Sequence, residues 1–527
     1  MKNQYDYIII GAGSAGCVLA NRLSARANCR VLLLEAGGSH RRPMIAIPIG
    51  YGKSFFDPKV NWCLNTEPDP NTDQRQHYYP RGKILGGSSS INAMVIMRGL
   101  RRDFVDWSQK LGNHWQTDSL LRAFKTVSEQ FSFQTFPESM HPMCDNFFDA
   151  CADHHILKVS DLNDTEAASV GHYPLAIQNG KRESAATAYL DPIKDRKNLI
   201  ILTNTKARKI CLDDEKRAVA VETQHPKRGA EYFTARAEIL LCAGSIHSPL
   251  LLEASGIGTP KILQQCGVHA TVENQHVGAH LQDHLGASHY YATNRATLND
   301  ILGTWHGKIR AVLDYLIFRR GALSLSLNHA GGYATLHPKS QAPDTQLYFS
   351  PMQFSHAPRG GGPKVTAERR NGFLLGFNIA RSTSEGSVHL NANNKAEIHP
   401  NYLDTTYDQE MAVLGSRFMQ KLSLNKAFES VITQRLTPEK ILNSDAELLE
   451  DFRKRCGTVY HPCGTVRMAQ SAQDGAVDPE FRIFGTKGLR VIDASVFPSV
   501  TSANISAAVM MVAEKASLMI NNTLKNQ

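Results

Sequence analysis

The stretch YDYIIIGAGSAG, residues 5–16, decides the fold of the first part of this chain. Its first six residues are mostly apolar and predict a buried strand, and its three glycines predict a tight turn that opens a helix. The run RVLLL at residues 30–34 predicts a second buried strand. Glu35 follows about 20 residues after the glycines, where a carboxylate can accept hydrogen bonds from an adenosine ribose. The stretch therefore predicts a strand–helix–strand unit that binds a dinucleotide.

The size and hydropathy of the chain indicate a packed globular protein. Its 527 residues leave room for two domains, and a hydrophobic content of 42% is ordinary for such a protein. The longest apolar runs, such as residues 505–513, are much shorter than a membrane span. The first strand begins at residue 5, which leaves no room for a cleaved signal peptide. We therefore expect a cytoplasmic protein without a transmembrane segment, and peripheral contact with the inner membrane stays open.

Charge and cysteine content narrow the class of protein further. The net charge of +9 comes from Lys and Arg residues scattered along the chain, which favours an ordinary solvated surface over a site for anionic lipid or an acidic substrate. No nucleic-acid partner is expected. The ten cysteines include no C-x-x-C pair, so neither an iron–sulfur cluster nor a zinc ribbon is expected. We expect most of them to be small buried side chains, as at Cys17 and Cys242, in a reducing compartment.

Apolar patterning outlines two further regions. Short runs predict strands at residues 199–202, 218–222 and 238–242. Four later runs predict a mainly antiparallel sheet outside the nucleotide fold, at residues 344–350, 372–380, 386–391 and 396–399. Residues 305–320 have helical spacing and predict a helix of the core or between domains, and PRGGGP at residues 358–363 predicts a loop.

Four blocks, in order, resemble the glucose–methanol–choline (GMC) family of FAD-dependent oxidoreductases. They are residues 5–38, the run PRGKILGGSSSINAM at 80–94, residues 244–258 beginning GSIHSPLLL, and a C-terminal block at 461–467 and 478–515. The resemblance covers essentially the whole chain and is to members like the bacterial alcohol and choline dehydrogenases.

The resemblance implies an α/β fold. A Rossmann-like FAD-binding domain would carry an inserted α+β substrate domain built on a mainly antiparallel sheet. The discontinuous FAD-binding domain is assigned to residues 1–40, 81–150, 198–287 and 456–527. Residues 151–197 and 288–455 are assigned to the substrate domain, and residues 41–80, rich in Pro, Asn and Asp, to a lid-like excursion.

The FAD site is expected where glycines let the backbone approach the pyrophosphate at a helix N-terminus. By the resemblance, the 81–94 segment lies along the isoalloxazine, and Asp493 lies near the pyrophosphate and ribityl chain. The assigned FAD contacts are Gly11, Gly13, Ser14, Ala15, Gly16, Glu35, Ala36, Arg81, Gly86, Gly87, Ser88, Asn92, Ala93, Met94, Ala207, Ala243, Gly244, Asp493, Ala494, Asn504 and Ile505. Some members attach FAD covalently through a histidine, and here the matching position is Ile91, so we expect dissociable FAD.

A histidine and an asparagine near the C-terminus form the expected catalytic pair. Oxidising an alcohol requires a base for the hydroxyl proton, and histidine is the side chain suited to that task at neutral pH. His461 in HPCGTVR and Asn504 in TSAN match the family's pair. The resemblance implies that His461 takes the proton, that Asn504 hydrogen-bonds the substrate oxygen, and that the flavin accepts the hydride.

Two other kinds of site, a metal site and a hydrolase nucleophile, can be tested against the sequence. His276, His280 and His284 fall at intervals of four, which raises the alternative of a metal site. Gly278 interrupts the stretch and no further ligand cluster is evident, so we expect no metal. No Gly-x-Ser-x-Gly run occurs, so the serines at 88–90 do not predict a hydrolase.

The substrate is expected to be an alcohol other than choline. Choline-oxidising members carry a glutamate two residues after the Asp-His of residues 283–284, and here that position is Gly286. We expect oxidation of an alcohol to the aldehyde or ketone, with a primary alcohol favoured as the substrate and with electrons passed to a quinone or another acceptor. An oxygen-using oxidase, a hydroxynitrile lyase of the same family and a flavin-bearing scaffold protein remain alternatives. An NAD-dependent dehydrogenase is disfavoured because the second and fourth blocks have no role in that fold.

Overall fold

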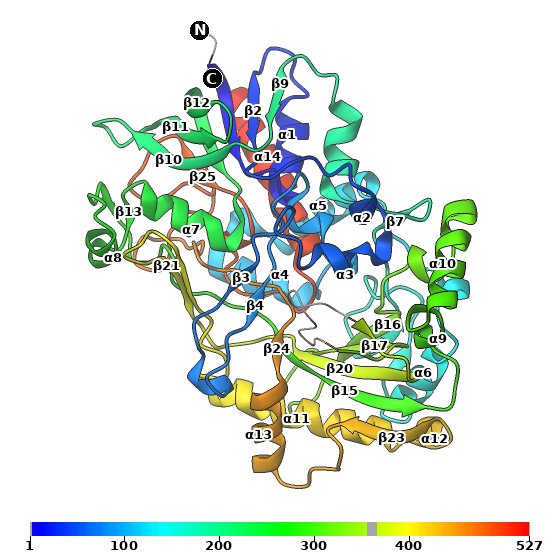
Figure 1. Ribbon diagram of the computed structural model, residues 1–527. Coiled ribbons are helices and arrows are strands. Elements are labelled where there is room, and N and C mark those ends of the chain that lie inside the picture. The colour runs from blue at the N-terminus through cyan, green and yellow to red at the C-terminus, as the bar shows by residue number, and fades with distance from the viewer. Residues whose placement is uncertain (1–2, 356–365, 526–527) are drawn as a thin grey trace.

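Two β-sheets organise the computed structural model, which describes residues 3–355 and 366–525 (Figure 1). The first sheet has seven strands and the second has eight, with helices packed on both. The fold is therefore α/β with a second unit built on another sheet, as the sequence predicts. The loop expected at residues 358–363 lies outside the described residues.

The first sheet is built on the predicted strand–helix–strand unit. Strands β1 (Gln4–Ile10), β2 (Val31–Leu34) and β9 (Leu199–Leu202) are parallel to one another and to β12 (Gly229–Leu241). β25 (Leu489–Val491) also pairs with β12 in parallel, while β10 (Lys206–Leu212) and β11 (Ala218–His225) add an antiparallel edge. The central strands are buried on both faces, which explains their continuous apolar runs.

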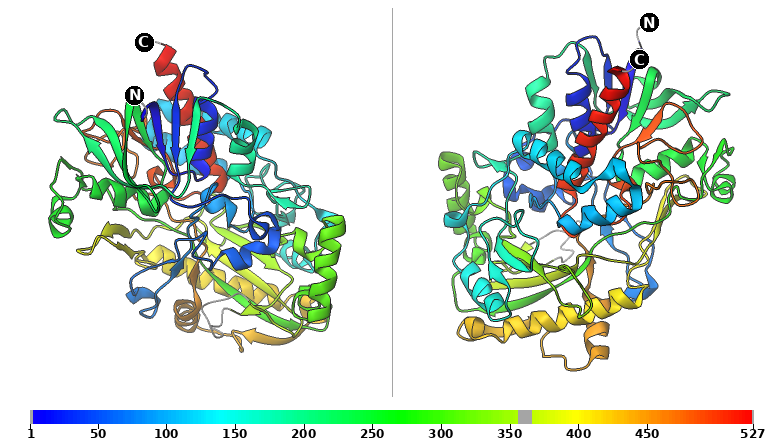
Figure 2. Two further views of the ribbon diagram at one scale, coloured as in Figure 1. Left: turned by 45° about the horizontal axis from the view of Figure 1, so that its top comes forward. Right: turned by 180° about the vertical axis from the view of Figure 1, so that it is seen from behind.

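Helices from opposite ends of the chain cover one face of this sheet. α1 (Ser14–Leu23) lies beside the C-terminal α14 (Ser506–Lys525), and α5 (Thr117–Gln130) packs against α14 in turn (Figure 2). Arg22 of α1 binds both carboxylate oxygens of Glu514 at 2.8 and 2.7 Å. The termini therefore meet in one layer, and the C-terminal block is held against the nucleotide unit.

The second sheet is mainly antiparallel, as predicted. Its strand order is β23 (Ile432–Thr437), β15 (Leu285–Thr293), β20 (Gly372–Ile379), β17 (Thr345–Ser350), β16 (Ala330–Ala334), β6 (Ser169–His172) and β5 (Leu157–Lys158), with β24 (Gly457–Thr458) also paired to β15. Only the β5–β6 pair is parallel among these described strands. β21 (Ser387–Leu390) and β22 (Ala396–His399) form at the predicted positions but pair as a separate hairpin.

The long helix α11 (Thr406–Ser423) lies across the second sheet, and the sequence pattern did not predict it (Figure 1). Gly415 permits its close approach to β20, because a Cβ there would lie 2.0 Å from Cε2 of Phe377. Phe377 and Phe349 are fully buried in this core. The remaining longer helices are α4 (Arg101–Leu111), α6 (Cys144–Ala152), α7 (Gly244–Ala254), α8 (Pro260–Gln265), α9 (Leu298–Leu302), α10 (Trp305–Phe318) and α13 (Asp445–Arg455).

The excursion at residues 41–80 is folded rather than extended. It contains α2 (Pro43–Ala46), α3 (Tyr51–Ser54), and the short pair β3 (Leu64–Asn65) and β4 (Tyr78–Tyr79). Its backbone binds the 81–94 segment, since Lys83 N donates to Val60 O at 2.8 Å. A small apolar cluster of Ile45, Val60, Ile84 and Ile91 joins the two segments.

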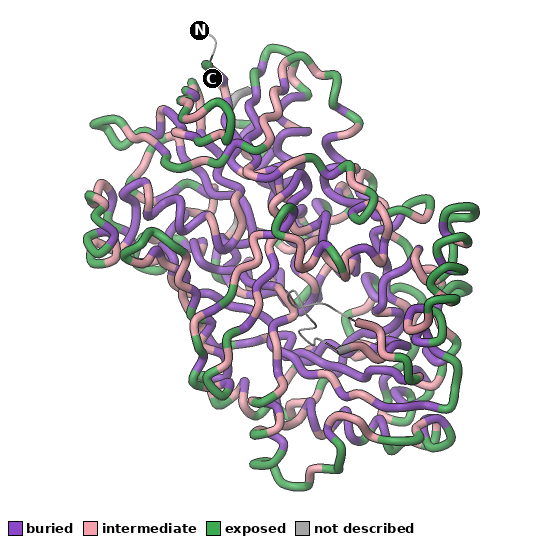
Figure 3. Tube along the Cα trace, in the orientation of Figure 1, coloured by how far each residue is buried: buried purple, intermediate pink, exposed green. Residues whose placement is uncertain are grey.

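One sequence prediction about the core is wrong. The helix expected at residues 305–320 forms as α10, but only Ala311 and Tyr315 of it are buried. Its other large apolar side chains face outward, and the helix is among the most exposed parts of the trace in Figure 3. Among the described residues, no helix combines the length and apolar character needed to cross a membrane.

The close contact at Gly415 predicts a specific cost. Gly415→Ala should lower the free energy of unfolding by about 1–3 kcal/mol, because the new methyl group overlaps the Phe377 ring in a packed core. The midpoint of thermal unfolding measures this. Gly52→Ala in α3 is the matched control, since a Cβ there meets nothing within 4 Å. A Gly415→Ala protein as stable as the parent would contradict the packing described.

Candidate active site

The glycine turn after β1 is shaped by close packing on one side and open space on the other. Gly11 has a φ of +99°, and a Cβ there would lie 2.5 Å from Cys242 O. A Cβ on Gly16 would lie 1.9 Å from Gly11 O. At Gly13, in contrast, a Cβ would meet no atom within 4 Å. The turn therefore presents bare backbone at Gly13 and the N-terminus of α1, which fits the approach of a pyrophosphate.

Glu35 closes β2 beside this turn, as predicted. Its carboxylate accepts hydrogen bonds from Ala12 N at 3.0 Å and from Gly37 N at 2.7 Å. Burial raises the pKa of Glu35 to about 7. Each oxygen of a carboxylate has a second lone pair, so the group can still accept from ribose hydroxyls while it braces the turn.

The 81–94 segment lies directly on the glycine turn. Gly86 N donates to Ala12 O at 2.7 Å, and a Cβ on Gly87 would lie 2.7 Å from Gly13 Cα. Gly86 and Gly87 both have positive φ, at +89° and +54°, where the short 3₁₀ turn η3 (Gly87–Ser90) begins. The first two blocks of the sequence thus form one backbone surface.

Two side chains in this segment already have protein partners. Ser88 Oγ accepts from Gly82 N at 3.1 Å, which leaves its own proton to donate. Asn92 Oδ1 accepts from Met94 N at 3.0 Å and from Arg182 at 2.8 Å. Burial lowers the pKa of Arg182 to about 9, yet its guanidinium is satisfied by backbone carbonyls around it. Arg182 therefore fixes the shape of the segment, and sequence reasoning missed it.

Asp493 lies at the end of β25, where it joins two loops. One oxygen accepts from Gly244 N at 2.8 Å and Ser248 Oγ at 2.6 Å, and the other accepts from Ser495 N at 2.8 Å. Burial raises the pKa of this carboxyl group. A Cβ on Gly244 would meet nothing within 4 Å, so this loop, like Gly13, presents bare backbone to open space.

The other residues assigned to FAD lie on the same elements, with one at a sheet edge. Ser14 and Ala15 begin α1, Ala36 follows Glu35, Ala93 follows Asn92, Ala243 precedes α7, Ala494 begins η9 (Ala494–Val496), Ile505 precedes α14, and Ala207 lies on β10. Arg81 donates to Tyr460 O at 2.8 Å, which ties the second block to the residue before His461.

His461 and Asn504 converge, as the sequence predicts. Asn504 Nδ2 lies 3.1 Å from His461 Nε2, although the residues come from separate loops after β24 and before α14. Gly464 N donates to Ala494 O at 3.1 Å, so the run that holds His461 is anchored beside the Asp493 loop. His461 is buried, and burial together with the neighbouring His284 and Arg81 lowers its pKa well below the usual value.

A chain of hydrogen bonds fixes the tautomer of His461. His284 Nε2 lies 3.0 Å from Ala380 O, and a carbonyl can only accept, so this nitrogen carries the proton. In neutral His284 the Nδ1 atom is then the acceptor, and it lies 2.9 Å from His461 Nδ1. His461 must therefore be protonated at Nδ1. Its Nε2 atom is then unprotonated and accepts a hydrogen bond from Asn504 Nδ2.

Gln346 orients the asparagine from the far side. Its Nε2 donates to Asn504 Oδ1 at 3.2 Å, so the Asn504 amide nitrogen is turned toward His461. Gln346 lies on β17 of the second sheet, far from Asn504 in sequence. No local pattern marks it, and sequence reasoning missed it.

Asp283 holds the loop of His461 in place. One of its oxygens accepts from His461 N and from His284 N, both at 2.8 Å. The other accepts from the hydroxyls of Tyr79, Tyr402 and Thr458 at 2.8, 2.7 and 2.5 Å. Asp283 and His284 belong to the block that includes Gly286, which was the available signal for them.

The three histidines considered for a metal do not converge. His284 turns to His461, while His280 Nδ1 lies 2.6 Å from Glu385, which also binds Arg467 at 2.8 Å. His276 lies against His280 and Gln473 O. No group of three or more His, Cys, Asp or Glu residues suited to a metal ion occurs in the part of the chain that the structure describes.

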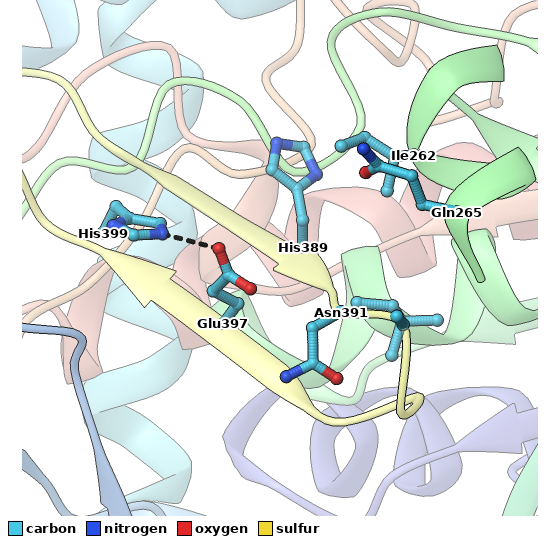
Figure 4. A pocket seen from close by; sticks show the side chains of 8 residues that line it. Ile262, Gln265, His389, Asn391, Glu397 and His399 are labelled. Atoms are coloured by element: carbon cyan, nitrogen blue, oxygen red, sulfur yellow. Dashed lines mark hydrogen bonds and ion pairs between the residues drawn. The ribbon is translucent and has the colours of Figure 1, made fainter.

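A surface pocket lies elsewhere, between α8 and the β21–β22 hairpin. Its lining includes Gln265, His389, Glu397 and His399, with an ion pair between the last two (Figure 4). None of the residues assigned to FAD or to catalysis lines it. We assign this pocket no role in the reaction.

The nucleotide-type sheet and the pairing of buried His461 with half-buried Asn504 define an oxidoreductase architecture, and comparison with known proteins names the family. Family profiles for the N-terminal and C-terminal parts of GMC oxidoreductases match residues 5–286 and 382–513. The chain belongs to the GMC oxidoreductase family, which confirms the resemblance read from the sequence.

Individual relatives match over almost the whole chain. Alcohol dehydrogenase [acceptor] of Pseudomonas putida is 32% identical over 98% of this chain and 95% of its own. The mitochondrial choline dehydrogenase of Mus musculus is 32% identical over 98% and 90%. The structure of pyridoxine 4-oxidase from Mesorbium loti superposes with a TM-score of 0.86 at 28% identity, over 98% of this chain and 99% of that one. A formate oxidase structure has a TM-score of 0.90 at 24% identity over 99% of each chain, which shows the shared fold.

The hydrogen-bond chain predicts that His284 acts through His461. His284→Phe should lower the rate of flavin reduction about 10- to 100-fold, because His461 Nδ1 loses its acceptor and the imidazole can rotate or change tautomer. Stopped-flow absorbance under anaerobic conditions measures this rate. His276→Gln is the control, since it alters the same block outside the chain of bonds. An unchanged rate in His284→Phe would refute the role.

Proposed function

We propose that this chain is an FAD-dependent alcohol dehydrogenase that oxidises a primary alcohol other than choline. Electrons would pass to a quinone or another acceptor. The observation that carries the proposal is the unprotonated His461 Nε2 atom facing the Asn504 amide at 3.1 Å in a buried site. A base and a hydrogen-bond donor side by side are what removal of a hydroxyl proton requires.

The bare backbone at Gly13 and Gly244 supports FAD as the cofactor, together with family membership. Gly11, Gly13 and the N-terminus of α1 would hold the pyrophosphate, Glu35 the adenosine ribose, and the 86–94 segment the flavin. When bound, FAD would supply the acceptor for the hydride of the carbinol carbon and the route of the electron pair to the external acceptor. The protein's own groups handle the proton.

The substrate hydroxyl would bind beside both catalytic side chains and replace the hydrogen bond between them. Asn504 Nδ2 carries two hydrogens, so it can donate to the substrate oxygen while the substrate O–H donates to His461 Nε2. As the proton moves to Nε2, negative charge grows on the oxygen, and the Asn504 donor stabilises it. Gln346 keeps that donor pointed inward, because it holds the Asn504 carbonyl oxygen.

The depressed pKa of His461 keeps it in the basic form before reaction. Burial, His284 and Arg81 all disfavour the charged imidazolium. Since the shift is downward, the neutral form persists at neutral pH and is lost only at acidic pH. The same environment favours release of the proton after the hydride has left.

The setting of Gly286 supports the exclusion of choline. Gly286 is paired with Asn378 in the β15–β20 ladder, and a Cβ there would lie 2.4 Å from Phe377 O and 2.9 Å from Asn378 Cβ. No carboxylate side chain fits at this position on the present backbone. The chain therefore lacks the charge that would attract a trimethylammonium group at this point.

The proposal predicts the effect of removing the base. His461→Ala should slow flavin reduction by about 10²–10⁴-fold while the protein keeps its FAD, because the general base is lost and the cofactor contacts are not. The test is anaerobic mixing of the holoenzyme with a panel of alcohols that includes choline, followed by the visible absorbance of the flavin.

Bleaching by one or more alcohols but not by choline supports the proposal, and reoxidation with oxygen or a quinone analogue then identifies the acceptor. A lyase or a scaffold protein would not bleach with any alcohol. Normal bleaching in His461→Ala would remove His461 from the mechanism.

The buried position of Ile91 predicts dissociable FAD. Ile91 has no nucleophilic atom and packs among Ile45, Val60 and Ile84. Acid precipitation of the holoenzyme should therefore release the flavin into the supernatant, where its absorbance can be measured. Flavin that stays with the precipitated protein would show a covalent link and contradict this expectation.

A further inference from the structure

The helix α10 carries an apolar face that no other part of the described chain covers. Eight of the fourteen exposed large hydrophobic residues of the described chain fall between Ile301 and Phe318. Six of them share one side of α10 by helical spacing, and we call this set the apolar ridge: Trp305, Ile309, Val312, Leu313, Leu316 and Ile317. Trp305 and Ile317 are each 65% exposed, so the ridge is open along its length.

The ridge is held outward by contacts on the opposite side of the helix. Ala311 and Tyr315 face inward, and Tyr315 donates its hydroxyl to Gly180 O at 2.9 Å. Thr304 caps the helix by accepting from Gly307 N at 3.2 Å. In each view of Figures 1 and 2, α10 lies at the edge of the molecule. The exposure therefore follows from how the helix is anchored, and contiguous apolar surface of this kind marks an interaction site.

Positive charge outweighs negative charge on and next to α10, although Arg310 lies 3.9 Å from Asp314. Residues 295–320 contain five Lys or Arg residues and two Asp residues. Lys308, Arg310, Arg319 and Arg320 are exposed on or just after α10. Arg369 and Arg370 are also exposed and follow Glu368, whose carbonyl accepts from Asn299 of α9 at 2.9 Å. An apolar stripe flanked by cations matches a surface that is apolar inside and anionic outside.

We propose that α10 docks this protein on the surface of a membrane that contains anionic phospholipid. The apolar ridge lies in the boundary between headgroups and acyl chains, and the surrounding Lys and Arg side chains bind lipid phosphates. The helix lies in the plane of the interface, in keeping with the finding that no described helix could span a bilayer. This inference rests on the surface alone and is independent of the proposed activity.

A second copy of the chain fits the same surface less well. In a two-fold interface the same patch meets itself, so the cations around the two ridges would face each other. Like charges brought together in this way oppose association, whereas an anionic membrane neutralises them. Charge complementarity therefore favours lipid as the occupant.

Vesicle binding by the intact holoenzyme tests the proposal. The parent protein should co-sediment with vesicles of phosphatidylcholine and phosphatidylglycerol, and more weakly with phosphatidylcholine alone or at high salt. The combined variant Leu313→Ser, Leu316→Ser and Ile317→Ser should bind at least about tenfold more weakly, because the ridge loses its apolar centre. An unchanged flavin spectrum and thermal midpoint would show that the variant is folded.

A matched control removes exposed apolar side chains elsewhere. Leu424→Ser with Leu518→Ser changes two residues that are 59% and 62% exposed outside α10, and it should bind vesicles like the parent. Failure of the parent to bind, or equal binding by the ridge variant, would overturn the proposal. So would a parent dimer in gel filtration that the ridge variant turns into a monomer without any vesicle binding.

The fluorescence of Trp305 can report how deeply α10 lies in the bilayer. Vesicles with brominated acyl chains should quench part of the parent's tryptophan fluorescence, because this indole lies on the ridge. Trp107 and Trp115 are buried in the protein and are shielded from the lipid. Trp305→Phe should lose the vesicle-dependent quenching, and the same quenching in that variant would place the lipid contact elsewhere.

Discussion

The candidate active site depends on the hydrogen bonds that the carboxylate of Asp283 accepts. It accepts two backbone N–H groups and three hydroxyls, from residues that lie on the excursion, the loop before β15, the loop after β22 and the ends of β24. A buried carboxylate is costly unless its lone pairs are satisfied, and here five donors satisfy them. The cost of burying this one charge is therefore offset only when all these segments meet, so the position of His461 is coupled to the meeting of the two sheets.

The hydrogen bonds around His461 form a chain in which each group fixes where the next one carries its proton. The carbonyl of Ala380 fixes the proton of His284, His284 fixes that of His461, and Gln346 fixes the face of the Asn504 amide. A histidine can present either nitrogen as a base, and the surroundings decide which. Here the second sheet supplies that decision, since Ala380 follows β20 and Gln346 lies on β17. The second sheet would thus take part in the proposed removal of the substrate proton by His461.

Sequence reasoning succeeded where the signal is local and failed where it depends on distant packing. The turn at Gly11 and the carboxylate of Glu35 follow from short spacings that the backbone itself imposes, and the pairing of His461 with Asn504 came from family resemblance. Arg182 and Gln346 carry no local pattern, because their partners lie far away in the chain. For α10 the apolar spacing predicted the helix correctly, but burial was wrong because periodicity records which side chains are apolar and not what covers them.

Packed side chains connect α9 and α10, the helix that carries the apolar ridge, to the 81–94 segment. α9 and the turn after α10 share an apolar cluster of Leu298, Leu302, Leu327 and Met352 with Ile49 and Tyr51 of the excursion. Leu327 N donates to the Tyr51 hydroxyl at 3.3 Å, and the excursion in turn binds the 81–94 segment through its backbone. Docking of α10 on a bilayer would therefore also fix the distance and tilt of the 81–94 segment relative to that bilayer. On the proposed activity, an alcohol or quinone dissolved in that bilayer would reach the enzyme from the side on which α10 docks.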